Sequence, residues 1–292
     1  MGTHYFDINR KIIANMTSES WKSVPHVCIV YEADVDLLSE VLTSWRSQSD
    51  GERISFNAAL LRLVVEGICA CPAMNGHVHY HPWLVSGKVI YLEHIDISMP
   101  MRYGKDRMIT VTLPQMEKRS MREIQAMIAD FKAKLESAQM NRVLFKTGLS
   151  DTFSRLRHGH VLMAAGRLAG AKFGPGRVRL TPGTVESGTG LTPDNIRQGS
   201  ITVSNMGSLY RGWKGNCTIL EIIPPQLCAL AIGAVQKRPV ADREDRVRVA
   251  QIVPITIAFD HRALDCGDIV PFMERLDSLL QDRAWLEDAV RQ

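Results

Sequence analysis

The chain has 292 residues, of which 45% are hydrophobic and 23% charged, and its formal net charge is +4. This composition is typical of a globular protein with a sizeable core, and so small a net charge does not indicate a nucleic-acid partner. An apolar run of membrane-spanning length and a signal-peptide core are both missing from the sequence, so we expect no membrane span and a cytoplasmic location. Six cysteines, without paired metal-ligand spacing, are predicted to be reduced core residues.

The first 71 residues alternate between helical and extended patterns. Apolar spacing predicts helices at 9–21 and 36–45, separated by a strand of β-branched residues at 26–35. Asp36 is expected to cap the second helix. A further helix at 55–71 is apolar nearly all round, which predicts a core helix with Cys69 and Cys71 as packing residues.

Three histidines alternate in the segment that follows, so a strand would place His77, His79 and His81 on one face. Imidazoles in such a row can bind a metal, but no carboxylate or cysteine nearby completes the shell, and a polar face at a sheet edge is the favoured interpretation. We therefore expect no metal. Further strands are predicted at 89–99 and 107–115, and Ser120 with Glu123 forms a capping box before an amphipathic helix.

Residues 142–200 form a basic segment that becomes rich in glycine and proline after Gly166. It lacks the strand, glycine-rich turn and helix of a phosphate loop, so a nucleotide site there is not expected. The basic stretch 152–173 could contact a phosphate-bearing ligand, an acidic partner or a membrane surface, but a solvated connector or insertion is the favoured interpretation. Residues 191–199 predict a short capped helical turn.

Two strand ends carry polar residues that suggest chemistry. The strand at 201–204 ends at Asn205, and its Ser204 hydroxyl either donates a hydrogen bond to a developing oxyanion or caps the turn. A buried strand is predicted at 227–240. The next strand, at 253–260, is expected to have one buried face and leads into a turn with His261 and Asp265, where proton transfer and a solvated turn are equally plausible; Asp268 is expected to cap the helix that follows.

These segments together resemble the catalytic domain of the acyltransferase (E2) component of 2-oxo acid dehydrogenase complexes, in the chloramphenicol acetyltransferase-like superfamily. The resemblance covers nearly the whole chain in the right order and rests on these matches: the helix residues 10–16 with Pro25 and His26, the "CPAMNGHV" segment, Thr202–Gly207, "PPQLCALAIGAVQKRPV" and Asp260–Cys266. It implies an α/β (α+β two-layer) fold with helices packed on a mixed sheet, formed by residues 1–292 as a single catalytic domain. Lipoyl and peripheral-subunit-binding domains have no counterpart in this sequence.

The resemblance also implies a mechanism and an assembly. His261 would act as general base on a thiol of coenzyme A or a dihydrolipoyl group, and Ser204 would donate to the oxyanion. Asp265 would form a structural ion pair with Arg10. Asn205 is a weaker candidate, because asparagines in turns are often purely structural. The implied partners are acyl-CoA and a lipoyl carrier protein, in a homotrimer or larger trimer-based assembly with the site between subunits.

One residue, Cys266, departs from the family pattern, and it bears on whether the protein is an active acyltransferase or an inactive scaffold. Cys266 stands where the family has glycine, a residue that tolerates positive φ, and Gly267 is expected to take over the turn. The first hypothesis is an acyl-CoA-dependent acyltransferase; the second is an E2-like scaffold without activity, favoured by Cys266. A third, acyl transfer to an amine or alcohol, is disfavoured because Asp260 replaces the second histidine of condensation domains. The sequence does not specify the acyl group or the acceptor.

Overall fold

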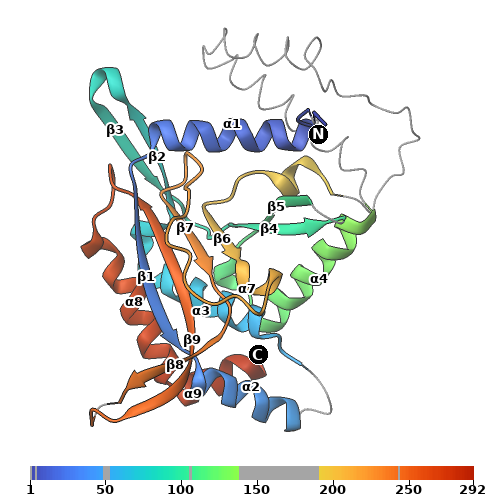
Figure 1. Ribbon diagram of the computed structural model, residues 1–292, viewed down its shortest axis with the longest axis vertical. Helices are drawn as coiled ribbons and strands as arrows, with labels where there is room; N and C mark the ends of the chain where they lie inside the picture. The colour runs from blue at the N-terminus through green and yellow to red at the C-terminus, as the bar shows by residue number, and fades with distance from the viewer. Residues whose placement is uncertain (1, 4, 49–52, 105–106, 138–190, 243) are drawn as a thin grey trace.

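The computed structural model describes residues 2–3, 5–48, 53–104, 107–137, 191–242 and 244–292. Its main sheet runs in the order β1-β9-β7-β6-β4-β5, with β8 paired to β9 beyond the end of β7 (Figure 1). Parallel pairing joins β4 to β6 and β6 to β7, and the other pairs are antiparallel. The strands are β1 (His26–Asp34), β4 (Ile97–Tyr103), β5 (Arg107–Leu113), β6 (Ile201–Asn205), β7 (Cys228–Ile232), β8 (Gln236–Ala241) and β9 (Val247–Asp260). The expected mixed sheet with helices packed on it is confirmed.

The longest strand, β9, organises the sheet because it pairs with β1 along one edge and with β7 and β8 along the other. Its alternation is as predicted: Ile255, Ile257 and Phe259 enter the main core. The prediction of only one buried face is wrong, however. Thr256, Ala258 and Asp260 are also buried, because the chain after β6 covers the second face, where Ile222 packs with Ala258 and Ala229.

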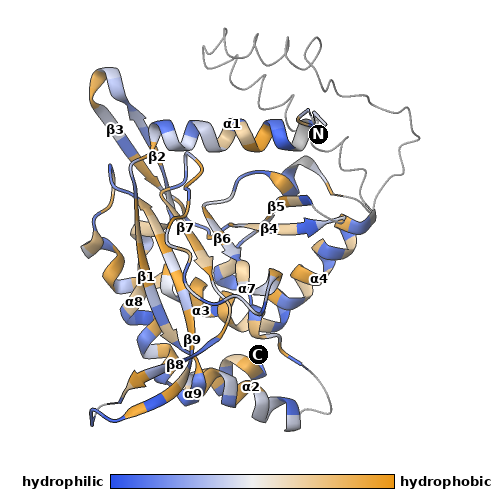
Figure 2. Cartoon of the chain, viewed as in Figure 1, coloured by the Kyte–Doolittle hydropathy of each residue, from blue (hydrophilic) through white to orange (hydrophobic). Residues whose placement is uncertain are grey.

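Helices cover the first face of the sheet. Phe272 and Leu276 of α8 lie with Val64 and Ile68 of α3 and with the β9 side chains in one apolar cluster. Figure 2 shows orange, hydrophobic stretches along α3, α8 and β9. The cluster forms because α3 is apolar nearly all round, as predicted. The helices are α1 (Ile8–Ser23), α2 (Asp36–Gln48), α3 (Phe56–Ala70), α4 (Met121–Ser137), α7 (Met206–Leu209), α8 (Cys266–Gln281) and α9 (Arg283–Arg291).

Two predicted strands are each divided in the structure. The segment 89–99 splits into β3 (Ser86–Tyr91) and β4, because β3 pairs with β2 (Gly76–His81) in a separate hairpin. The segment 227–240 splits into β7 and β8 around Gly233, where a Cβ would lie 2.7 Å from Pro254. Local apolar pattern does not show such breaks, since they depend on which strand each half pairs with.

Helix starts differ in detail from the predictions. Ser120 and Glu123 form the expected capping box: the Ser120 N–H donates to the Glu123 carboxylate at 2.9 Å, and the Glu123 N–H donates to the Ser120 hydroxyl at 3.3 Å. Asp36 is the first residue of α2 rather than its cap, and its N–H donates to Asp34 Oδ1 at 3.1 Å. The turn predicted at 191–199 is the 3-10 helix η4 (Pro193–Ile196), while the basic connector at 142–190 lies outside the described residues.

The cysteines are less uniformly buried than expected. All six have free thiols, but only Cys71 and Cys228 are buried, while Cys69 and Cys266 are exposed. The packing role predicted for Cys69 is therefore wrong, because α3 turns this residue away from the core at its last turn. Within the described ranges, no helix is long and apolar enough to cross a membrane.

Candidate active site

The turn after β9 is fixed by a buried charge. Asp260 is fully buried, and its carboxylate accepts from Arg262 Nε at 2.9 Å and Nη2 at 2.5 Å. The Asp260 carbonyl also accepts from the backbone N–H of Ala263 at 3.0 Å, and the His261 N–H donates to the Pro25 carbonyl at 3.0 Å. A buried carboxylate needs such compensation, so the ion pair holds the turn in one conformation at the edge of β1. This role of Asp260 and Arg262 was not predicted, and its only signal in the sequence is the charged pair that flanks the histidine.

The imidazole of His261 is held through one ring nitrogen. Its Nδ1 lies 3.0 Å from the Leu264 carbonyl oxygen and 3.3 Å from Asp265 Oδ1. A carbonyl oxygen only accepts hydrogen bonds, so Nδ1 carries the proton and Nε2 holds the lone pair. The ring stands edge-on to Phe259, with centroids 6.1 Å apart, and its side chain is half exposed. The geometry therefore presents Nε2 as a base.

Asp265 pairs with the histidine rather than with Arg10 within this chain. It precedes the first residue of α8, and its N–H donates to Asp268 Oδ2 at 2.8 Å. Asp265 is therefore the cap, and the prediction that Asp268 caps this helix is wrong, because Asp268 stands in its first turn. Its side chain is 81% exposed. Arg10 lies near the start of α1, about 20 Å along the helix from the end that adjoins β1. Among the described residues of one chain, no ion pair joins Arg10 to Asp265.

Ser204 lies on the second face of the sheet, at some distance from His261. The strand register aligns Ser204 with Ala231 and, one strand further, with Thr256. His261 therefore stands five residues beyond that level, about 16 Å along β9, and two strands across, about 10 Å. The imidazole and the hydroxyl of one chain cannot contact the same reacting atom.

Asn205 is occupied by structural hydrogen bonds. Its Oδ1 accepts from the Ser208 N–H at 2.8 Å, which caps α7, and its Nδ2 donates to the side-chain oxygen of Asn57 on α3. Gly207 follows, and a Cβ there would lie 2.4 Å from the Gly233 carbonyl oxygen. These contacts of Asn205 fix the end of β6, as expected if Asn205 has a structural role in the turn.

Gln226 holds the polar face of β6 in place, a role that was not predicted. It is fully buried, accepts from the Thr202 hydroxyl at 2.7 Å and donates to the Gly199 carbonyl at 2.9 Å. Its position after two prolines gives no local signal of this role.

Cys266 occupies its position without backbone strain. It is the first residue of α8 and exposed, and among the described residues positive φ at non-glycine positions occurs at Val85, Gln115 and Asp245. Gly267 also has no positive φ, and a Cβ there would meet nothing within 4 Å. The expectation that this turn needs glycine is wrong, because α8 begins at Cys266, three residues earlier than a cap at Asp268 would place its start.

The histidine row lies on β2. His77 is half-buried, its Nε2 lies 3.3 Å from the Gly199 carbonyl oxygen, and burial lowers the pKa of its ring. His79 and His81 are exposed. Across the part of the chain that the structure describes, no three His, Cys, Asp or Glu side chains gather closely enough to hold a metal ion.

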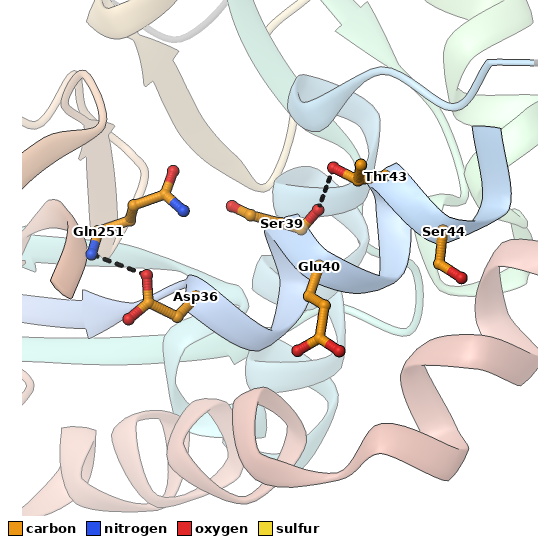
Figure 3. Close-up of a pocket in the computed structure, with 6 residues that line it drawn as sticks. All are labelled: Asp36, Ser39, Glu40, Thr43, Ser44 and Gln251. Atoms are coloured by element: carbon orange, nitrogen blue, oxygen red, sulfur yellow. Dashed lines mark hydrogen bonds between the residues drawn. The ribbon is translucent and has the colours of Figure 1, made fainter. Parts of the chain in front are cut away.

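A polar pocket of about 440 Å³ lies far from His261 (Figure 3). Gln251 of β9 is ten residues before His261, about 33 Å along the strand, and its N–H donates to Asp36 Oδ1 at 2.9 Å. The pocket is lined by Asp36, Ser39, Glu40, Thr43, Ser44 and Gln251. It is separate from the strand ends that carry His261 and Ser204.

The fold is that of solved dihydrolipoamide acetyltransferases. A structure from Azotobacter vinelandii superposes with a TM-score of 0.69 at 15% identity, covering 98% of this chain and 93% of that one. A probable dihydrolipoamide acetyltransferase from Listeria monocytogenes gives 0.65 at 18% identity, covering 96% and 94%. At these identities the likeness establishes the fold.

The sequence comparisons define the family. The profile of the 2-oxoacid dehydrogenases acyltransferase (catalytic domain) matches residues 4–148 and 185–286, and the chain belongs to this family. Its relatives include the dihydrolipoyllysine-residue acetyltransferase components of the pyruvate dehydrogenase complex from Rickettsia conorii, 24% identical over 88% of this chain and 48% of that protein, and from Zymomonas mobilis, 25% identical over 93% and 48%. The chain thus spans about half the length of these curated relatives.

Proposed function

We propose that this protein transfers an acyl group between coenzyme A and a thiol acceptor of the dihydrolipoyl type, with His261 as general base. The observation that carries the proposal is the Nδ1–H bond to the Leu264 carbonyl, which leaves Nε2 free to take a proton. Family membership and the names of the relatives, which are acetyltransferase components, support the same class of reaction.

The residues can perform the transfer in two proton-coupled steps. Nε2 of His261 removes the proton of the acceptor thiol, and the thiolate sulfur attacks the carbonyl carbon of the acyl-CoA thioester. A serine hydroxyl donates to the oxyanion of the tetrahedral intermediate. The carbon–sulfur bond to coenzyme A then breaks, and the departing thiolate takes the proton back from the imidazolium.

The serine in this mechanism belongs to a second copy of the chain. The register keeps Ser204 and His261 of one chain about 19 Å apart, so a shared site requires a subunit interface. One relative of the same fold, with a TM-score of 0.65, is the cubic core of a pyruvate dehydrogenase multienzyme complex. We propose a homotrimer or trimer-based assembly, with acyl-CoA and a lipoyl carrier protein as partners.

Nothing in the geometry of the described residues favours the scaffold or transfer to an amine or alcohol. The scaffold hypothesis relied on strain at Cys266, and this residue lies unstrained at the start of α8. Transfer to an amine or alcohol relied on resemblance to condensation domains, but the position before the histidine holds Asp260, which is buried and paired with Arg262.

The test is a screen of acyl-CoA donors with dihydrolipoamide, an amine and an alcohol as acceptors, measuring release of coenzyme A. His261→Ala should lower the rate with dihydrolipoamide by about 10²–10⁴-fold while the assembly persists. Turnover that survives in His261→Ala would refute the base assignment, and an assembled wild-type protein inactive with every donor would favour the scaffold.

Mixing two inactive variants tests the shared site. In randomly assembled His261→Ala and Ser204→Ala subunits, about one quarter of interfaces pair an intact histidine with an intact serine, so about one quarter of wild-type activity should return. If a mixed assembly recovers no activity, His261 and Ser204 either act within one chain or do not belong to the same site.

A further inference from the structure

A strap of chain, residues 211–223, joins α7 to β7 without forming a helix or strand (Figure 1). It lies on the second face of the sheet, and side chains of neighbouring elements hold it at single points. The Thr256 hydroxyl of β9 donates to the Cys217 carbonyl, and the Ser20 hydroxyl of α1 donates to the Ile222 carbonyl at 2.6 Å. The strap is therefore attached to the sheet by separate side-chain contacts and not by a strand ladder.

Between these two points the strap contacts a thiol of β1. The backbone N–H of Leu220 donates to Cys28 Sγ at 3.5 Å, and the same sulfur lies 3.7 Å from the Leu220 carbonyl oxygen. Among the described residues, no other group hydrogen-bonds these two backbone atoms. A thiol is only a weak donor and a weak acceptor, so this part of the strap is held weakly.

A second thiol, that of Cys217 in the strap, touches the same peptide group. It donates to the Ile219 carbonyl at 3.2 Å, and that carbonyl belongs to the peptide bond whose N–H reaches Cys28. Because only one peptide group separates them, the two sulfur atoms are at most about 9 Å apart. Burial raises the pKa of the Cys217 thiol, and Cys28 nearby raises it further.

The strand register places the two cysteines together independently of these contacts. Cys28 opposes Ala258 on β9 and packs with it on the second face. Thr256, which holds the Cys217 carbonyl, is two residues away on the same face, and such diagonal neighbours are about 7–8 Å apart. A disulfide joins Cα atoms about 4.4–6.8 Å apart. A small movement of the weakly held strap, with a turn of the Cys217 side chain, is therefore enough to bring the sulfurs together.

We propose that Cys28 and Cys217 are a redox modification site, at which a small-molecule disulfide oxidises the two thiols to a disulfide bond that ties the strap to β1. The Cys217 thiolate attacks one sulfur of the oxidant and displaces a thiolate, which leaves a mixed disulfide on Cys217. The Cys28 thiolate then attacks the Cys217 sulfur and displaces the second thiolate. The two protein thiols lose two electrons and two protons, and the oxidant is reduced to two thiols.

The other four cysteines should respond differently to the same oxidant. Cys71 and Cys228 are buried, so the oxidant does not reach them in the folded protein. Cys69 and Cys266 are exposed, and each should take up one half of the oxidant as a mixed disulfide. The proposed bond does not depend on the acyl transfer proposed above, because it needs only the contacts between the strap and β1.

The test is oxidation of the full chain with glutathione disulfide, followed by digestion without reductant and peptide mass spectrometry. The expected product is a peptide pair joined through Cys28 and Cys217, in a protein that runs as a single chain on a non-reducing gel, and dithiothreitol should remove the link. The matched control, Cys69→Ser, should form the link as the wild type does. Cys28→Ser keeps a hydrogen-bonding group beside Leu220 and should form no link, which leaves Cys217 as a mixed disulfide with glutathione.

Thermal melting measures whether the bond ties the strap down. Closing so long a loop should raise the Tm of the oxidised wild type by roughly 4–8 °C over the reduced protein, and oxidation of Cys28→Ser should give no such rise. Circular dichroism should show every variant folded. The proposal is overturned if Cys28 and Cys217 of the folded wild type stay free or each carry glutathione. A link to another cysteine or another chain would also overturn it, as would a Cys28–Cys217 link with an unchanged Tm.

Discussion

Asp260 and Arg262 form a two-point ion pair directly beside the candidate base, with the carboxylate fully buried and the guanidinium side chain 20% exposed. The same guanidinium faces the Tyr80 ring. One arginine therefore neutralises the end of the central strand and links it to the β2–β3 hairpin.

Arg262→Met should destabilise the protein by about 3–5 kcal/mol, because it leaves the Asp260 carboxylate buried without a partner. Urea unfolding measures the change. The control Arg246→Met removes a guanidinium that is 73% exposed and should change the free energy of unfolding little. Equal effects of the two substitutions would contradict the structural role of Arg262.

Asp265→Asn should reduce kcat by less than about tenfold, because the Leu264 carbonyl still holds the Nδ1 proton of His261 and asparagine still caps α8. Steady-state kinetics with dihydrolipoamide measures it. A loss as large as that of His261→Ala would mean that the carboxylate itself takes part in the reaction.

Cys266→Gly restores the family residue and should not raise activity, because cysteine already adopts the helical conformation at this position. The substitution should lower stability by less than about 1 kcal/mol, since glycine loses more conformational freedom on folding. Kinetics and thermal melting check both statements. A marked gain in kcat would show that the cysteine side chain obstructs the substrate.

Thiol labelling should divide the cysteines by burial. In the native protein, iodoacetamide should modify Cys69 and Cys266, which are exposed, while Cys71 and Cys228 react only after unfolding. Burial raises the pKa of both buried thiols, so a moderate rise in pH should not make them reactive. Peptide mass spectrometry measures each site, and rapid native labelling of Cys228 would contradict the packing of β7.

Acid stability should depend on Glu117. Burial alone raises the pKa of this carboxyl, but hydrogen bonds from the backbone N–H of Ile95 at 3.0 Å and from the His94 ring at 2.9 Å outweigh it and leave the pKa lowered. A lowered folded pKa gives stability above the unfolded pKa that is lost as pH falls through the folded value. Glu117→Gln should flatten the fall in the free energy of unfolding as the pH drops below the ordinary glutamate pKa of about 4.3. Parallel curves for the wild type and the variant would contradict the assignment.

Much of the local structure follows from the sequence because it depends on near neighbours. The alternation of Ile255, Ile257 and Phe259, the apolar surface of α3 and the Ser120–Glu123 box are set by residues a few positions apart. The matched segments that carry the family resemblance are also local, so the fold and the candidates His261 and Ser204 were predicted from them.

The turn after β9 shows what the sequence does not determine. The sequence by itself determined that a histidine stands at this strand end in a protein of this family. Only the tertiary structure decided that Asp260 is buried with Arg262, that Nδ1 of His261 is held by the Leu264 carbonyl, and that Ser204 lies about 19 Å away in the same chain. The separation of Ser204 from His261 and the burial of Asp260 follow from the pairing of strands that are distant in sequence, and the pattern of one strand does not show which strand it pairs with. The contact of His261 with Leu264 depends on the conformation that the turn adopts at the end of β9.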